Sequence, residues 1–193
     1  VCLFIAYPTA YILARGGFRK SGVWMLLLVT PMWINFTLRI TALKEVLNLI
    51  EGNLAFHPLF NAVLCMVYDF LPFMILPIYN SIARIKPDVI EAAKDLGANS
   101  RIVLIRIIFP LTLSGVISGI VMVFVPALTS FVISDLLGGG KVLLIGNVIE
   151  QEFMQGSNWN LGSGLSVVLM IFVIASMAVM NIFDKDQGGT AVW

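Results

Sequence analysis

Charged side chains are scarce in this sequence. Asp, Glu, Lys and Arg make up 12% of the 193 residues, about half the share found in soluble globular proteins. Hydrophobic residues make up 59%, so the polar surface is too small to cover a water-soluble globule. We therefore expect a protein surrounded by a lipid bilayer, with no nucleic acid among its partners. The net charge of +1 adds little, because the distribution of charges is informative and their sum is not.

The residue types that carry catalysis or hold metals are also few. Cys2 and Cys65 lie in apolar runs without metal-site or disulfide spacing, and the single histidine, His57, has no second ligand in helical register. Residues 138–141 read GGGK, but the glycine spacing of a phosphate-binding loop is missing and Val142 stands where Ser or Thr is required. No serine lies in a nucleophile elbow. We expect no enzymatic activity, no metal and no cofactor in this chain.

Apolar runs predict an all-α polytopic bundle within a transmembrane domain over residues 1–183. The five predicted spans cover residues 1–14, 24–43, 57–80, 111–134 and 161–183. The first is short, because 14 helical residues reach about 21 Å against about 30 Å of hydrocarbon. We expect a six-span parent of which five spans are present, and a signal peptide is the weaker interpretation. Pro31 is expected to kink the second span, and Pro72 and Pro77 to break the third.

Basic residues predict the orientation of these spans, because they favour cytoplasmic loops. Two connections are rich in them, namely Arg15, Arg19 and Lys20 after the first span and Arg84, Lys86, Lys94, Arg101 and Arg106 after the third. The opposite loops, 44–56 and 135–160, carry more carboxylates than cations. We therefore place the loop over 81–110 and a tail over 184–193 in the cytoplasm, and the chain in a cytoplasmic membrane as a multi-pass protein.

The cytoplasmic loop over 81–110 carries local helix signals. Pro87 suits the first position of a helix, and Gly97 suits the left-handed position that follows a helix end. Asn99 or Ser100 is expected to cap a second helix that runs to Pro110. The loop is thus predicted to hold two short helices.

One face of the first of these helices is suited to docking. Val89, Ala93 and Leu96 share it at i, i+4 and i+7 spacing, and Ala92 and Ala93 permit close backbone approach. An ordinary capped amphipathic helix is the alternative interpretation, since such helices occur in many cytoplasmic loops.

A family resemblance favours the docking interpretation. EAAKDLG, followed by nine residues and IIFP, resembles the EAA loop of binding-protein-dependent ATP-binding cassette importer permeases. The matching positions are Glu91, Ala92, Ala93, Gly97, Ile107 and Pro110. The one departure is Phe109, where the family has leucine. The resemblance implies the type I importer permease fold and a role for the six residues in coupling to a partner ATPase.

Three further stretches narrow the resemblance. Residues 68–82, 110–153 and 158–169 are similar to the first permease type of spermidine/putrescine importers. This implies a bacterial cytoplasmic (inner) membrane, a second permease subunit and an extracytoplasmic polyamine-binding protein. It also implies two copies of a cytoplasmic ATP-binding subunit, which would hold ATP and Mg.

Carboxylates inside spans are costly and mark candidate pathways. The predicted substrate-pathway residues are Asp69 and Asp135 for the ammonium groups, and Tyr68, Trp33 and Phe131 for the methylene stem. Alternatives stay open for several of them. Asp69 can instead pair with a basic residue of another span or of a partner permease, Asp135 can cap the glycine loop, and Trp33 can anchor at the interface. Arg39 is expected to snorkel or to pair with a carboxylate.

Two acids of the outer loop remain outside this set. Glu150 and Glu152 are expected on a solvated face or against a periplasmic binding protein. Within the importer class, the alternative cargo is another small solute such as a ferric ion, thiamine or an amino-acid-like cation. A self-contained channel and an intramembrane enzyme are the alternatives of another class.

Overall fold

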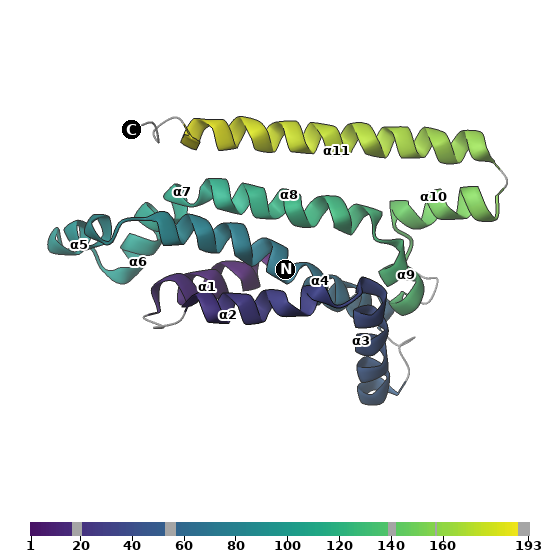
Figure 1. Cartoon of the computed structure of the whole chain (residues 1–193), viewed down its shortest axis with the longest axis horizontal. Coiled ribbons are helices and arrows are strands. Elements are labelled where there is room, and N and C mark those ends of the chain that lie inside the picture. Colours follow the sequence, from purple (N-terminus) through teal and green to yellow (C-terminus); the bar gives the residue numbers. More distant parts are fainter. Residues whose placement is uncertain (17–20, 53–56, 139–141, 157, 189–193) are drawn as a thin grey trace. The chain divides into compact units, whose positions relative to one another are not determined.

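A computed structural model of the chain describes residues 1–16, 21–52, 57–138, 142–156 and 158–188. The described residues form helices joined by turns, with no strand among them, so the all-α prediction is confirmed (Figure 1). They fall into two compact units. Arg19 and Lys20 of the first predicted cytoplasmic loop, and residues 189–193 of the predicted tail, lie outside the described residues.

The first unit comprises Val1–Leu28, Pro72–Met122 and Val179–Trp193. Its elements, in chain order, are α1 (Cys2–Arg15), α2 (Ser21–Val29), the second half of α4 (Pro58–Arg84), α5 (Pro87–Asp95), α6 (Ser100–Val103), a π-helical turn (Leu104–Ile108), α7 (Phe109–Leu111) and the first half of α8 (Leu113–Thr129). Ile75, Ile78 and Ile82 of α4 are completely buried. These isoleucines recur every three to four residues, so one stripe of α4 faces the interior of this unit.

The second unit comprises Val29–Leu71 and Val123–Ala178. It contains a 3₁₀ turn (Thr30–Trp33), α3 (Phe36–Glu51), the first half of α4, the end of α8, α9 (Phe131–Leu137), α10 (Ile145–Met154) and most of α11 (Trp159–Gly188). Its core joins three helices, through Ile40 and Leu47 of α3, Ala62, Cys65 and Phe70 of α4, and Ile133 and Leu137 of α9. The buried Cys65 is therefore a core residue.

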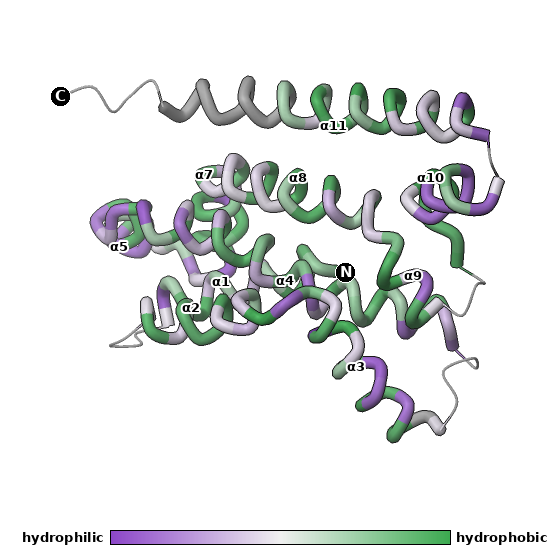
Figure 2. Tube along the Cα trace, turned by 45° about the vertical axis from the view of Figure 1, so that its right-hand side comes forward, coloured by the Kyte–Doolittle hydropathy of each residue, from purple (hydrophilic) through white to green (hydrophobic). Residues whose placement is uncertain are grey.

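The helices of the chain differ in hydropathy. Figure 2 shows hydrophobic residues along α4, α8 and the described part of α11, and hydrophilic residues gathered on α5 and α10. Among the described residues, α4 and residues 159–178 are each long and apolar enough to cross a membrane. Two bent helix pairs also meet the criteria of length and composition when each pair is counted as one span, which gives up to four candidate spans. At 14 residues, α1 is an apolar helix below that length.

The expectation that Pro72 and Pro77 break the third span is wrong. Both prolines lie inside α4, which continues without interruption to Arg84. Proline removes one backbone donor, but its fixed φ is compatible with a helix, and packed neighbours compensate for the lost hydrogen bond in membrane helices. One such neighbour is α8, where a Cβ on Gly115 would stand 2.7 Å from the Pro77 carbonyl oxygen. Glycine thus permits close backbone contact beside a proline.

The second predicted span, over 24–43, is divided in the structure. Pro31 is the second residue of the 3₁₀ turn, and the chain then bends by 96° before α3. Asn35 starts the new helix, because its side-chain oxygen accepts a hydrogen bond from the Thr37 amide at 2.9 Å. Pro31 and Asn35 are both local signals for a break. The predicted kink at Pro31 was therefore smaller than the bend that the two residues produce together.

The last two predicted spans also differ in extent. The helix predicted over 111–134 is bent by 64° at Thr112 and ends at Thr129, after which α9 begins. The loop predicted over 135–160 contains α10, which the hydropathy pattern did not predict. The span predicted over 161–183 lies within α11, which continues to Gly188 and therefore into the predicted tail.

Candidate functional site

The helix predicted at the centre of the loop over 81–110 is present as α5. Pro87 is its first residue and Asp88 lies in its first turn, where a negative charge is favoured. Gly97 follows the helix with φ of 82°, in the left-handed region that side chains other than glycine rarely adopt. The Ala98 amide donates to the Ala93 carbonyl at 3.0 Å, which completes the hydrogen bonding of a glycine-terminated helix. Both predicted boundary signals are confirmed.

The residues of the predicted docking face of α5 differ in burial. Ala93 is 8% exposed, whereas Leu96 is 89% exposed. The reason is that the helix ends at Asp95, so Leu96 no longer follows the helical repeat. Glu91 and Ala92 are exposed beside it. Ala93 therefore holds α5 to its unit, and Glu91, Ala92 and Leu96 are presented outward.

The second part of the loop is helical but not uniformly α-helical. Asn99 caps α6, because its side-chain oxygen accepts from the Ile102 amide at 2.9 Å. Ile107 lies in the π-helical turn and is half-buried, and Pro110 is exposed within α7. The predicted stop at Pro110 is displaced to Thr112. We identify no signal in the sequence that predicts the π turn.

The bend at Thr112 is held from α1. The hydroxyls of Tyr7 and Thr112 lie 3.1 Å apart, and the rings of Tyr7 and Phe109 have centroids 5.6 Å apart. The Thr112 hydroxyl also donates to the Ile108 carbonyl at 2.9 Å. Thr112 is completely buried, so these bonds satisfy a polar group that would otherwise be costly to bury.

A second link from α1 reaches the end of α4. The Arg15 guanidinium donates to the carbonyl oxygens of Ile82, at 3.2 Å, and of Ile85. The Ile82 carbonyl lies in the last turn of α4 and the Ile85 carbonyl directly after the helix, where the helix dipole is negative. Charge counting had used Arg15 only as a marker of orientation. The structure shows that it caps the helix that leads into α5.

Asp69 is paired inside the second unit. Its Oδ1 lies 2.6 Å from Arg39 Nη2, and the two side chains are 2% and 9% exposed. Arg39 also donates to the Pro31 carbonyl at 3.4 Å. The arrangement matches the alternative in which Asp69 pairs with a basic residue of another span. It joins α3, α4 and the 3₁₀ turn.

Asp135 takes part in a polar cluster centred on Asn147. Asn147 is buried, and its Nδ2 donates to Asp135 Oδ1 at 2.6 Å and to the Phe131 carbonyl at 3.2 Å. Its Oδ1 accepts from the Leu144 amide at 3.1 Å. Asn147 thus fixes α9 against α10, and sequence analysis missed it. The signal was a lone amide among the apolar residues of 142–149.

A hollow of about 310 Å³ lies beside this cluster. Phe131 and Glu150 line it together with Thr129, Gly146, Ile149, Ser166 and Leu169. The Phe131 side chain is 37% exposed. An aromatic face, a carboxylate and aliphatic walls suit an organic cation with a methylene stem.

The remaining predicted pathway residues do not line this hollow. Tyr68 precedes Asp69 on α4 and is 46% exposed, and Trp33 ends the 3₁₀ turn and is exposed. The structure therefore brings Phe131 and Asp135 together through Asn147. It adds Glu150, which sequence analysis had assigned to a solvated face or to a protein contact.

Comparison with known proteins covers nearly the whole chain. Residues 6–186 match the family described as the binding-protein-dependent transport system inner membrane component. The chain is 37% identical over 187 residues to the spermidine/putrescine transport system permease protein PotB of Haemophilus influenzae, and 39% identical over 187 residues to that of Escherichia coli. A PotB homolog of Mycoplasma pneumoniae is 31% identical over 160 residues.

Each alignment covers a larger share of this chain than of the relative. For Haemophilus influenzae they cover 90% of this chain and 65% of the relative, for Escherichia coli 88% and 67%, and for Mycoplasma pneumoniae 74% and 56%. The chain thus spans about two thirds of the length of the first two relatives, and less of the third.

Proposed function

The chain belongs to the family of binding-protein-dependent transport system inner membrane components, and on this premise we propose that it is the permease subunit of an ATP-driven polyamine importer. The observation that carries the proposal is the 37–39% identity to permeases named for spermidine and putrescine transport. The proposed assembly contains a second permease, two cytoplasmic ATP-binding subunits that hold ATP and Mg, and an extracytoplasmic polyamine-binding protein. This chain supplies part of the pathway in a bacterial inner membrane.

The proposed coupling element is α5. Glu91 and Ala92 are exposed on it, Leu96 is exposed directly after it, and the buried Ala93 fixes it to its unit. Its position is set at both ends, by Arg15 at the end of α4 and by Gly97 after Asp95. When a partner bound to a short helix fixed in this way moves, the helices on either side of it move as well. The partner we propose is the cleft of an ATP-binding subunit.

The proposed cation site on the pathway is the hollow between Phe131 and Glu150. The ring face attracts an ammonium group by a cation–π interaction, and the carboxylate accepts a charge-assisted hydrogen bond. Ile149 and Leu169 line the same hollow and offer apolar walls to methylene groups. The hollow therefore offers one negative charge beside apolar surface, which suits one ammonium group and the methylene groups next to it.

We propose supporting roles for the two predicted aspartates. Asp69 acts on the pathway through Arg39, which it holds between α3 and α4. Asp135 acts through Asn147, which fixes the backbone of Phe131. Tyr68 and Trp33 are exposed and stay candidates for contact with the methylene stem.

The test is uptake by the reconstituted complex of both permeases, the ATP-binding subunit and the binding protein. We expect ATP-dependent uptake of spermidine or putrescine, and none of a ferric ion or thiamine offered in parallel. Preferential uptake of either of those solutes would assign the chain to another cargo. Uptake without ATP and without the binding protein would instead indicate a channel.

A further inference from the structure

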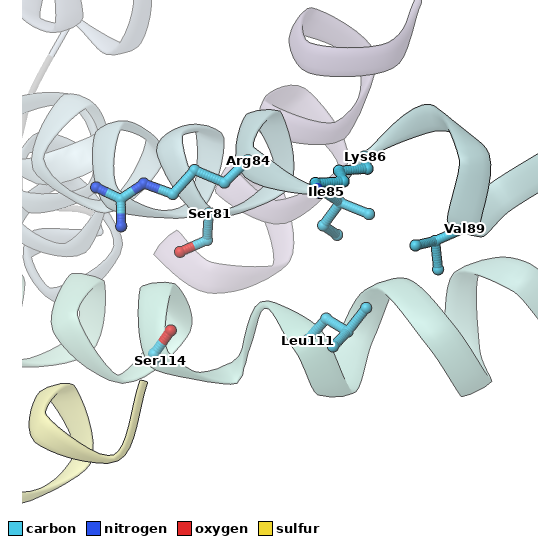
Figure 3. Close-up of a pocket in the computed structure, with 7 residues that line it drawn as sticks. All are labelled: Ser81, Arg84, Ile85, Lys86, Val89, Leu111 and Ser114. Atoms are coloured by element: carbon cyan, nitrogen blue, oxygen red, sulfur yellow. The ribbon is translucent and has the colours of Figure 1, made fainter. Parts of the chain in front are cut away.

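A second pocket, of about 240 Å³, lies where α4 ends and faces α7 and α8. Arg84 and Lys86 line it together with the hydroxyl residues Ser81 and Ser114. In Figure 3, Arg84, Ser81 and Ser114 lie toward one end, and Lys86, Val89 and Leu111 toward the other. The pocket therefore has one end with a cation and two hydroxyl groups, and an apolar end with a second cation.

The charge around this pocket favours an anion. No acidic residue is among the described residues that line it. The end of a helix is normally negative and would repel an anion. Here the Ile82 and Ile85 carbonyls accept hydrogen bonds from the Arg15 guanidinium, so a cation offsets that negative end. Glu91, an acid of the neighbouring α5, lines a separate pocket with Arg15 and Lys94.

The position of the pocket favours a lipid over a soluble anion. Helix α4 is a candidate membrane span, and Arg84 is its last residue. Basic pockets at the cytoplasmic ends of spans are suited to anionic lipid headgroups. Val89 and Leu111 are 43% and 48% exposed and offer an apolar surface beside the cations, which a free phosphate would not use.

We propose that this pocket binds the phosphate of an anionic membrane lipid. Arg84 binds the phosphate, the Ser81 hydroxyl donates to a phosphate oxygen, and the start of an acyl chain lies along Val89 and Leu111. Lys86 supplies a second positive charge beside the apolar end. Lys86 immediately precedes α5, so a bound lipid restrains the proposed coupling helix. This regulatory consequence rests on the proposed function, whereas lipid binding itself does not.

Native mass spectrometry of the assembled complex tests the binding. The complex is taken from phosphatidylcholine nanodiscs with and without phosphatidylglycerol, and retained phosphatidylglycerol is measured. Arg84→Gln/Lys86→Gln is expected to lower its affinity roughly thirtyfold, and Lys86→Gln alone about fivefold. Lys86 is exposed and lies outside any helix, so the single variant leaves the fold intact.

The matched control is Arg101→Gln/Arg106→Gln, which removes the same charge from two exposed residues of the same loop outside the pocket. It is expected to retain phosphatidylglycerol as the wild type does. An equal loss in both double variants would show general surface attraction and overturn the site, as would full retention in Arg84→Gln/Lys86→Gln. Inorganic phosphate is added in a parallel arm, and displacement of the lipid at equal concentration would reassign the pocket to a free anion. Because retention is measured without transport, failure here is distinguishable from failure of the proposed polyamine uptake.

Discussion

Arg39 and Asp69 form a buried ion pair, with Nη2 and Oδ1 2.6 Å apart, between α3 and α4. Both side chains are almost completely buried, so each charge depends on the other for compensation. The pair lies in the unit whose core joins α3, α4 and α9. It therefore fixes the helix that follows the 96° bend.

Removal of one partner of this pair is expected to be more harmful than removal of both. Asp69→Asn leaves the Arg39 charge uncompensated, at a cost of about 3–5 kcal/mol, and should lower the amount of folded permease in the membrane. Arg39→Met/Asp69→Leu replaces both charges by apolar side chains and should restore that amount. Quantitative immunoblotting of membranes measures it. Polyamine uptake that stays low at a restored level would show that transport needs the charged pair itself and not only the folded state.

Gly97 offers a test of the proposed coupling role of the loop without steric clash, because a Cβ at this position would meet no atom within 4 Å. Only the φ of 82° opposes a side chain. Gly97→Val should cost about 1–3 kcal/mol locally and lower both ATPase binding and coupled transport. Gly97→Asn is the control, since asparagine tolerates left-handed backbone, and it should retain most activity. Co-purification of the ATP-binding subunit gives the measurement, and normal transport by the valine variant would contradict the coupling role of α5.

Gly115 should be intolerant of even one methyl group. A Cβ there would lie 2.3 Å from Ser81 Oγ and 2.7 Å from the Pro77 carbonyl oxygen. Gly115→Ala is expected to destabilise the permease by about 1–3 kcal/mol, visible as a lower melting temperature in detergent. Gly164→Ala on α11 meets no atom within 4 Å and serves as the matched control. Equal melting of the two variants would refute the close packing of α8 on α4.

Glu150 is expected to contribute to polyamine recognition. Glu150→Gln keeps the shape of the side chain but removes its charge, so the KM for uptake should rise about tenfold as a charge-assisted hydrogen bond is weakened. Glu152→Gln removes the same charge on the same helix outside the hollow and should leave the KM unchanged. Equal effects of the two substitutions would indicate a general outer-surface charge instead of a site between Phe131 and Glu150.

Local chemistry was more predictable from the sequence than long-range pairing. The start of α5 at Pro87, the cap at Asn99 and the left-handed Gly97 follow from bonds within a few residues, and all three were predicted. The choice of Arg39 as the partner of Asp69 depends on the packing of two helices, which the sequence does not show.

The same distinction explains the errors. Pro72 and Pro77 are strong local breakers, but packing maintains α4 through both. Asn147 was overlooked because its importance comes from Asp135 and Phe131, which lie 12 and 16 residues away in the chain. Hydropathy alone treats such an amide as a defect in an apolar run.

The π-helical turn gives the spacing of the loop a geometric meaning. Each residue of an α-helix advances the chain by about 100° around the axis, whereas a π turn accommodates an extra residue over the same rise. Deleting one residue within Leu104–Ile108 would therefore remove the extra residue and restore a regular helix, with Thr112 still turned toward Tyr7. The loop between Gly97 and Thr112 thus holds one residue more than a regular helix of the same rise, and the π turn absorbs it without changing the direction in which Thr112 faces.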